Sequence, residues 1–173
     1  MCTDNIYDLV DSPDLDDMTD AFFFHGKESG PHGTKYKALW EIDPSIISPD
    51  FQGKDLAERL KIAEEATEGF SDLTLVGSSM GGLVAALLYQ KFPNRIANMV
   101  LLAPAFHWAE AKNIKELPPT VIIHGEQDEV VPISASEFAA KKFGSKLVRV
   151  QDGHRLHEAL PTIVKEFEQV LES

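Results

Sequence analysis

The chain has 173 residues, a length that favours one domain with one core. Hydrophobic residues make up 43% and charged residues 25% of it, which excludes a disordered chain or a coiled coil for most of the sequence. No apolar run approaches the roughly 20 residues that span a bilayer, and the first residues lack the basic and apolar parts of a secretory signal. The single cysteine, Cys2, cannot form an internal disulfide, which favours a reducing compartment. We therefore expect a cytoplasmic protein.

The net charge of −12 is concentrated at the N-terminus. Residues 1–20 contain seven aspartates and no Lys or Arg, which leaves −5 for the remaining 153 residues. Nucleic acids and anionic membranes bind a basic face, so neither is expected as a partner. The aspartate spacing matches no EF-hand loop, and we expect no metal site. We interpret residues 1–20 as an acidic extension and residues 21–173 as the domain.

Short apolar runs alternate with segments of helical periodicity along the rest of the chain. In chain order we expect a strand at 21–24, a loop at 27–37, a weak strand at 45–49, a helix at 54–68, a strand at 73–76, a helix at 83–91, strands at 98–103 and 121–124, a helix at 134–143, a strand at 146–150 and a helix at 156–171. Strands that are apolar throughout and alternate with helices indicate a parallel sheet covered on both faces. The predicted fold class is α/β, a three-layer α/β/α sandwich.

The strongest chemical signal is the sequence Gly77-Ser78-Ser79-Met80-Gly81-Gly82, between a predicted strand and a predicted helix. Its one G-x-S-x-G register places Ser79 on a sharp strand-to-helix turn, where the hydroxyl is exposed and glycines avoid clashes. The N-terminal amides of the following helix stabilise negative charge at such a turn. The pattern predicts Ser79 as a catalytic nucleophile; the alternative is a Gly/Ser-rich helix start without catalysis.

A serine nucleophile needs a histidine base and an acid that orients the base. Asp128 follows the strand at 121–124 and is the expected acid, since Glu126 lies earlier in the turn and Glu129 begins its exit. His154 lies in the glycine-containing loop after the last strand and is the expected base, with His157 as the alternative. Each residue would reach the same edge of the sheet as Ser79.

The order Ser79, Asp128, His154, each after its own strand, is that of the α/β hydrolases. Over residues 21–173 the chain resembles this superfamily, and in particular its short, lidless bacterial serine esterases of the YqiA-like kind. The resemblance rests on Phe24-His25-Gly26, the six residues from Gly77 to Gly82, His124-Gly125-Glu126-Gln127-Asp128 with Val131-Pro132, and Gly153-His154-Arg155.

The resemblance implies a minimal α/β-hydrolase fold of about six mostly parallel strands. Matched residue by residue, it implies an oxyanion hole formed by the backbone N–H groups of Lys27 and Met80, with His25 bracing the loop. Caps in this superfamily usually lie where this chain has only residues 104–120, a stretch too short for a lid domain.

Function is expected to be hydrolysis of short-chain carboxylic esters or thioesters through an acyl-enzyme on Ser79, without metal or cofactor. Phe106, His107 and Trp108 are candidates for the acyl pocket, although plain surface packing explains them equally well. The same triad could serve a thioesterase, an amidase or a C–C hydrolase, and a non-catalytic ligand-binding member of the fold remains the alternative from another class. The expected partner is a small acyl substrate. The sequence specifies no oligomeric state, and a monomer is compatible with it.

Overall fold

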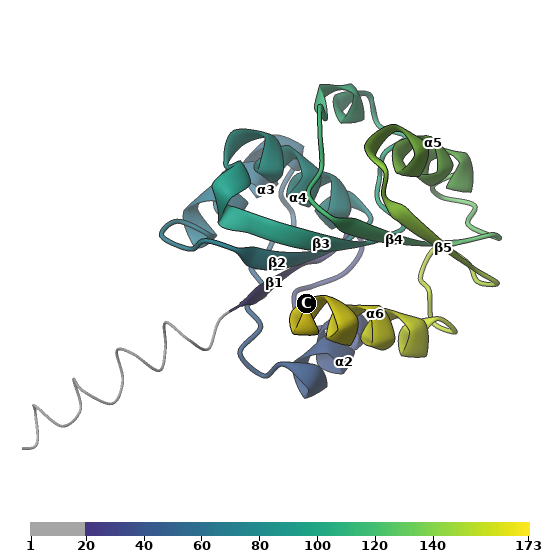
Figure 1. The fold of residues 1–173 in the computed structure, drawn as a ribbon, viewed down its shortest axis with the longest axis horizontal. Helices are drawn as coiled ribbons and strands as arrows, with labels where there is room; N and C mark the ends of the chain where they lie inside the picture. Colours follow the sequence, from purple (N-terminus) through teal and green to yellow (C-terminus); the bar gives the residue numbers. More distant parts are fainter. Residues whose placement is uncertain (1–19) are drawn as a thin grey trace, which may run out of the picture.

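A parallel sheet of five strands forms the centre of the molecule, in a computed structural model that describes residues 20–173 (Figure 1). The strands lie in their sequence order: β1 (Ala21–Phe24), β2 (Leu73–Ser78), β3 (Ile96–Leu102), β4 (Thr120–Gly125) and β5 (Lys146–Val150). Every neighbouring pair is parallel. All five strands therefore end at the same edge of the sheet, and the loops that follow them meet there.

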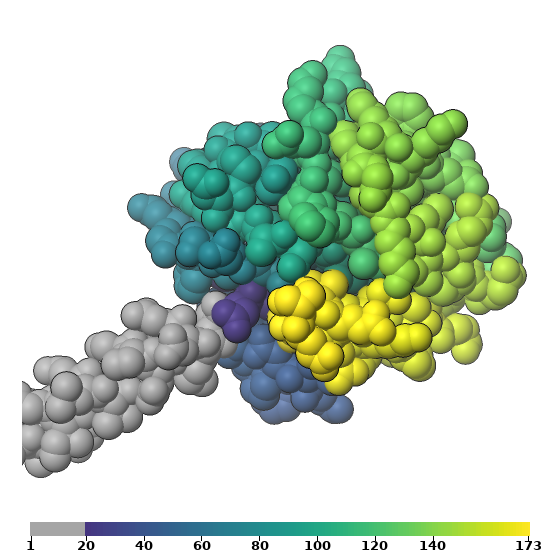
Figure 2. Space-filling view, in the orientation of Figure 1, coloured from purple at the N-terminus to yellow at the C-terminus, as the bar shows by residue number. Residues whose placement is uncertain are grey.

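Helices cover both faces of this sheet. The helices are α2 (Thr34–Ile42), α3 (Leu56–Ala66), α4 (Met80–Lys91), α5 (Ile133–Phe143) and α6 (Leu160–Glu172), with short 3-10 helices η1 (Pro93–Arg95) and η2 (Ala109–Asn113). Figure 1 shows α3, α4 and α5 on one face and α2 with α6 on the other. In Figure 2, α6 and the segment around α2 lie side by side on one side of the molecule. The predicted three-layer α/β/α fold is confirmed.

The side chains of β1 pack against helices on both faces of the sheet. Phe22 and Phe24 are fully buried against the α3 and α4 side, whereas Phe23 between them packs on the α2 and α6 side. Successive side chains of a strand point to opposite faces, so a run of three phenylalanines contributes to both cores. Burial on both faces explains why β1 is apolar throughout.

Three details of the predicted elements are wrong. The predicted strand at 45–49 is an isolated parallel bridge between Ile47 and Phe22, so the sheet has five strands rather than about six. The expected loop at 27–37 ends in α2, which begins at Thr34. The last helix begins at Leu160 rather than at 156, because Leu156 has a positive φ of 56° that an α-helix does not accept.

The acidic extension predicted for residues 1–20 lies, apart from Asp20, outside the described residues, as does Cys2. Within residues 20–173 no helix has both the length and the apolar character needed to cross a membrane.

Candidate active site

Ser79 lies between β2 and α4 in a backbone conformation that is rare for a residue with a side chain, with φ 54° and ψ −115°. The surrounding glycines make this turn possible. A Cβ on Gly81 would overlap the carbonyl oxygen of Phe24, and a Cβ on Gly77 would lie 2.6 Å from the carbonyl oxygen of Gly81. The turn is thus pressed against the end of β1, which fixes the Ser79 hydroxyl at the sheet edge.

Asp128 and His154 come from the loops after β4 and β5, and these two loops are packed together. The amide of Gln127 donates a hydrogen bond of 3.0 Å to the carbonyl of Asp152, and a Cβ on Gly125 would overlap that same carbonyl. Because a glycine at 125 permits this close approach, the loops that carry Asp128 and His154 are placed side by side.

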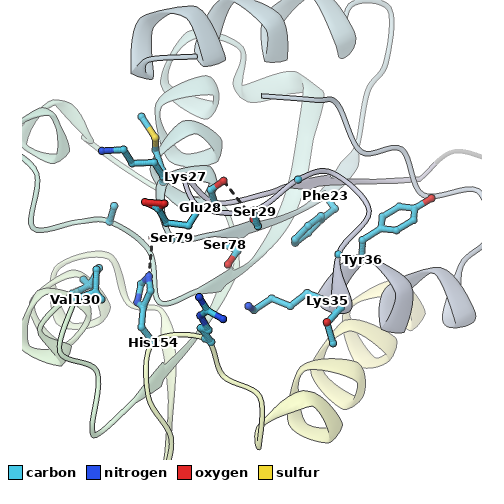
Figure 3. Close-up of a pocket in the computed structure, with 18 of the residues that line it drawn as sticks. Phe23, Lys27, Glu28, Ser29, Lys35, Tyr36, Ser78, Ser79, Val130 and His154 are labelled. Carbon is cyan, nitrogen blue, oxygen red and sulfur yellow. Dashed lines mark hydrogen bonds between the residues drawn. The ribbon is translucent and has the colours of Figure 1, made fainter. Parts of the chain in front are cut away.

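The three predicted residues form one chain of hydrogen bonds. His154 Nε2 lies 3.0 Å from Ser79 Oγ (Figure 3). On the other side of the ring, His154 Nδ1 lies 2.7 Å from Asp128 Oδ2. The Asp128 side chain is completely buried, whereas 21% of the His154 side chain is exposed. His157, the alternative base, lines the neighbouring cavity without a hydrogen bond to Ser79. A carboxylate that accepts from Nδ1 leaves Nε2 free to take a proton from the serine.

The buried Asp128 carboxylate has three further partners. Its Oδ1 accepts hydrogen bonds of 2.8 Å from the amides of Val130 and Val131. Its Oδ2 lies 3.2 Å from His124 Nε2, and His124 also contacts the Val131 carbonyl and Ser136 Oγ at 2.9 and 2.7 Å. A carbonyl can only accept, so the contact with Val131 requires a proton on His124 Nε2. These contacts hold the carboxylate in the orientation that His154 requires.

The loop after β1 passes beside Ser79, and hydrogen bonds of two buried side chains, His25 and Arg59, hold it in place. His25 accepts a 2.8 Å hydrogen bond from the Phe51 amide at Nε2 and contacts the Gly26 carbonyl with Nδ1 at 2.8 Å. Burial lowers the pKa of His25, which favours the neutral ring that this acceptor role needs. Arg59, also buried, donates to the carbonyls of His25 and Gly26 at 2.9 and 3.3 Å.

This bracing holds the loop that carries Lys27, whose amide is predicted to form an oxyanion hole with that of Met80, the first residue of α4. Lys27 and Met80 both line the cavity next to Ser79. Within residues 20–173, no other residue accepts a hydrogen bond from either of their backbone N–H groups. Both donors are therefore available to an oxygen bound beside Ser79.

A cavity of about 700 Å³ opens at Ser79 (Figure 3). His107 and Trp108 line it, as predicted for the acyl pocket, but Phe106 does not. Phe106 instead packs against the core and lines a second cavity of about 430 Å³ between η2 and α5. Burial lowers the pKa of His107, so its ring tends to be neutral beside the site.

Arg59 and Ser136 are two residues of the site that are not among those predicted from the sequence. Arg59 interrupts the apolar face of α3, three residues after Leu56 and four before Ala63, and a charge on an apolar stripe is a detectable signal. Ser136 has no such signal, since one serine near the start of a helix looks like any other.

Fold and site together define a class of protein. The parallel sheet, the strained serine turn and the acid and histidine on the next two loops are the arrangement of α/β hydrolases. The sequence profile of the alpha/beta hydrolase fold family matches residues 22–114, more than half of the chain. The chain belongs to this family and is a hydrolase.

Several solved structures share this architecture. A protein from Xanthomonas campestris pv. campestris assigned to the alpha/beta hydrolase superfamily is 26% identical, with a TM-score of 0.79 over 88% of this chain and 96% of that one. Est1E from Butyrivibrio proteoclasticus is 18% identical, with a TM-score of 0.76 over 87% and 86%. A thermophilic esterase from Thermogutta terrifontis is 15% identical, with a TM-score of 0.65 over 89% and 88%. No curated protein is significantly similar in sequence.

Proposed function

We propose that this hydrolase is a serine esterase that cleaves short carboxylic esters or thioesters through an acyl-enzyme on Ser79. The observation that carries the proposal is the unbroken hydrogen-bond chain from the buried Asp128 through His154 to Ser79, at the opening of a cavity. Esterases among the structural neighbours are consistent with it. A cytoplasmic location is part of the proposal, and the single cysteine, which cannot form an internal disulfide, supports it.

In the first half of the reaction, Ser79 Oγ attacks the acyl carbon while His154 Nε2 takes its proton. Asp128 accepts from Nδ1 and stabilises the imidazolium that forms. The substrate carbonyl oxygen becomes negatively charged, and the amides of Lys27 and Met80 donate to it. The N-terminus of α4 adds positive potential at the same point.

The first half ends when the bond from the acyl carbon to the leaving oxygen or sulfur breaks, His154 gives its proton to that leaving group, and the acyl group stays on Ser79. Deacylation is the second half. A water molecule then loses a proton to His154 and attacks the acyl carbon. The acid departs when Ser79 recovers its proton. Every proton passes through the one ring nitrogen that faces Ser79.

The test combines labelling with turnover. A fluorophosphonate probe labels an activated serine and should modify wild type at Ser79, whereas Ser79→Ala should not be labelled. Wild type and Ser79→Ala are then compared on nitrophenyl acyl esters, acyl-CoA thioesters and acyl anilides, which separate esterase, thioesterase and amidase activity. Because nucleophile and base act as a unit, Ser79→Ala should lower kcat by on the order of 10⁵ or more.

The conservative variant Ser78→Ala is the matched control for the label, since it removes a hydroxyl from the same turn and leaves Ser79 in place. Labelling of Ser78→Ala at the wild-type rate is expected. A wild-type protein that takes no label and turns over no acyl substrate would indicate the non-catalytic alternative.

A further inference from the structure

The cavity beside Ser79 carries an excess of positive charge in an otherwise acidic protein. The whole chain has a net charge of −12, yet the charged residues that line the cavity are three cations and one anion. They are Lys27, Lys35, Arg155 and Glu28. Three cations against one anion leave two positive charges in excess, and among the cations Lys35 and Arg155 are close enough to repel each other. A basic cavity in an acidic chain concentrates anions.

Lys35 lies in the first turn of α2, and its side chain extends into the cavity towards the side of His154 (Figure 3). It is partly buried, and no described residue forms an ion pair with it. Burial, and next the positive charge of Arg155, lower the pKa of Lys35. Two cations that repel each other next to a catalytic centre are unfavourable until an anion lies between them.

Arg155 directly follows the proposed base, His154, and it too has no ion-pair partner within residues 20–173. The nearby carboxylate of Asp152 attracts Lys35 but is already engaged. Its two oxygens accept hydrogen bonds from the amides of Gly153 and Ala159 at 2.8 and 2.9 Å. Within residues 20–173, no carboxylate therefore forms an ion pair with either of these cations.

We infer that the substrate supplies this anion: the natural ester carries a carboxylate or phosphate group that binds between Lys35 and Arg155 while its acyl carbon is at Ser79. A guanidinium presents a fork that matches either group, and an ammonium adds a point charge. The inference rests on the proposed function, and it names the substrate class of the same site.

Three matched pairs of esters test this inference and show which part of the substrate carries the anion. Nitrophenyl 4-carboxybutanoate against nitrophenyl pentanoate puts a carboxylate on the acyl side. The butanoate of 4-hydroxybenzoate against phenyl butanoate puts it on the alcohol side. The butanoyl ester of glycerol phosphate against that of glycerol replaces it with phosphate. For at least one pair, wild-type kcat/KM should be on the order of tenfold higher for the anionic ester at low salt.

Variants identify the residues responsible. Lys35→Met and Arg155→Met should each reduce the anionic-to-neutral ratio to near one, mainly through KM, and Lys35→Glu should reverse it. Lys37→Met is the control, since Lys37 is exposed on the same helix and does not line the cavity. It should keep the wild-type ratio. The preference should also weaken as salt is raised, because Lys35 and Arg155 are solvent-accessible.

A binding measurement separates this inference from the proposed function. Calorimetry with Ser79→Ala should show monomethyl glutarate binding more tightly than dimethyl glutarate, and Lys35→Met should remove the difference. Hydrolysis of neutral and anionic esters at equal rates, with equal binding, would overturn the inference and leave the esterase proposal intact. Anion-selective binding by a protein that hydrolyses no ester would overturn the esterase proposal instead.

Discussion

At the scale of single residues, Asp128 has more partners than an orienting acid strictly needs. Two backbone amides bind one oxygen, and two histidines lie next to the other. A fully buried carboxylate would be costly without such partners, and with them it has one orientation. The geometry of His154 therefore depends on groups that never approach a substrate.

The first prediction is that Asp128→Asn lowers kcat by about 10⁴. The amide oxygen of Asn would take over the bonds from the amides of Val130 and Val131, which leaves its NH₂ group facing His154 Nδ1. The ring would then carry its proton on Nε2, where it cannot accept one from Ser79. Steady-state kinetics on a nitrophenyl ester measures the loss.

Glu129→Gln is the matched control, because Glu129 is an exposed carboxylate in the same loop. It should keep wild-type kcat. A large loss in Glu129→Gln with little loss in Asp128→Asn would show that the acid has been assigned to the wrong residue.

The second prediction concerns Arg59, a positioning residue that holds the loop carrying the Lys27 amide. Arg59→Met removes the buried side-chain donor of the His25 carbonyl and one of the donors of the Gly26 carbonyl, which should lower the free energy of unfolding by about 2 kcal/mol. It should also lower kcat by roughly tenfold to a hundredfold with a smaller change in KM, since an oxyanion donor acts in the transition state. Urea unfolding and kinetics give the two values.

Lys61→Met, on the exposed side of the same helix, is the comparison variant and should change neither value appreciably. If Arg59→Met were destabilised but kept the wild-type kcat, Arg59 would have a structural role only.

At the scale of elements, the turn between β2 and α4 is where the sequence constrains the structure most. The third prediction is that Gly81→Ala destabilises the protein by at least about 3 kcal/mol, because the added Cβ would overlap the backbone at the end of β1. Gly33→Ala, where no atom lies within 4 Å of the added Cβ, should change the free energy of unfolding by less than about 1 kcal/mol. Thermal and urea unfolding measure both; equal effects would contradict the packing argument.

The strands β1 to β4 could be predicted from the sequence because each is a largely apolar run buried on both faces. The edge strand β5 has only exposed and half-buried residues, and its place in the alternation of strands and helices predicted it. The helix α2 could not, since Leu39 is its one fully buried residue and a Gly- and Pro-rich segment precedes it. A helix that buries so little leaves a weak periodic signal.

The residues of the hydrogen-bond chain could be predicted as well, because each directly follows an identifiable strand. The cation pair could not. Lys35 reaches the cavity only because the unpredicted α2 begins beside it, and Arg155 faces Lys35 only once two loops meet. Contacts between loops depend on the path of the chain, which local pattern does not encode.

At the scale of the whole molecule, the buried His25 makes stability depend on pH. Its pKa is lowered in the folded state, mainly by burial, so the folded protein binds its proton less readily than the unfolded chain does. The stability is fully present above the unfolded pKa of about 6.5 and is lost as pH falls from there through the folded pKa. The neighbouring Arg59 acts in the same direction, and Asp50, 3.8 Å away, opposes it.

The fourth prediction follows from this sign. The free energy of unfolding should fall between pH 7.5 and pH 5, by about 1.4 kcal/mol for each unit by which the His25 pKa is lowered. His25→Gln should be less stable at pH 7.5 yet lose less on acidification. Urea titrations at several pH values provide the comparison, and identical pH slopes in the two proteins would exclude His25 as the cause.

The shape of the whole molecule also limits the acyl chain. The connection from β3 to β4 consists of loop and the short η2, and it supplies His107 and Trp108 to the cavity. By volume, about 700 Å³ would hold a long chain. Its lining, however, includes lysines, an arginine and a glutamate, and an alkyl chain gains its roughly 0.8 kcal/mol for each CH₂ only where it contacts apolar surface.

The fifth prediction concerns the acyl-chain length of neutral esters. From acetyl to hexanoyl, kcat/KM should rise by up to about fourfold per carbon, the factor that corresponds to about 0.8 kcal/mol. For dodecanoyl and longer chains it should fall. Nitrophenyl esters assayed below their micelle concentrations measure the series. Lys35→Met replaces a charge in the lining by an apolar side chain, so it should move the optimum towards longer chains, whereas Lys37→Met should not. A wild-type protein whose kcat/KM increases steadily to palmitoyl would show that neither the short connection nor the polar lining limits the chain.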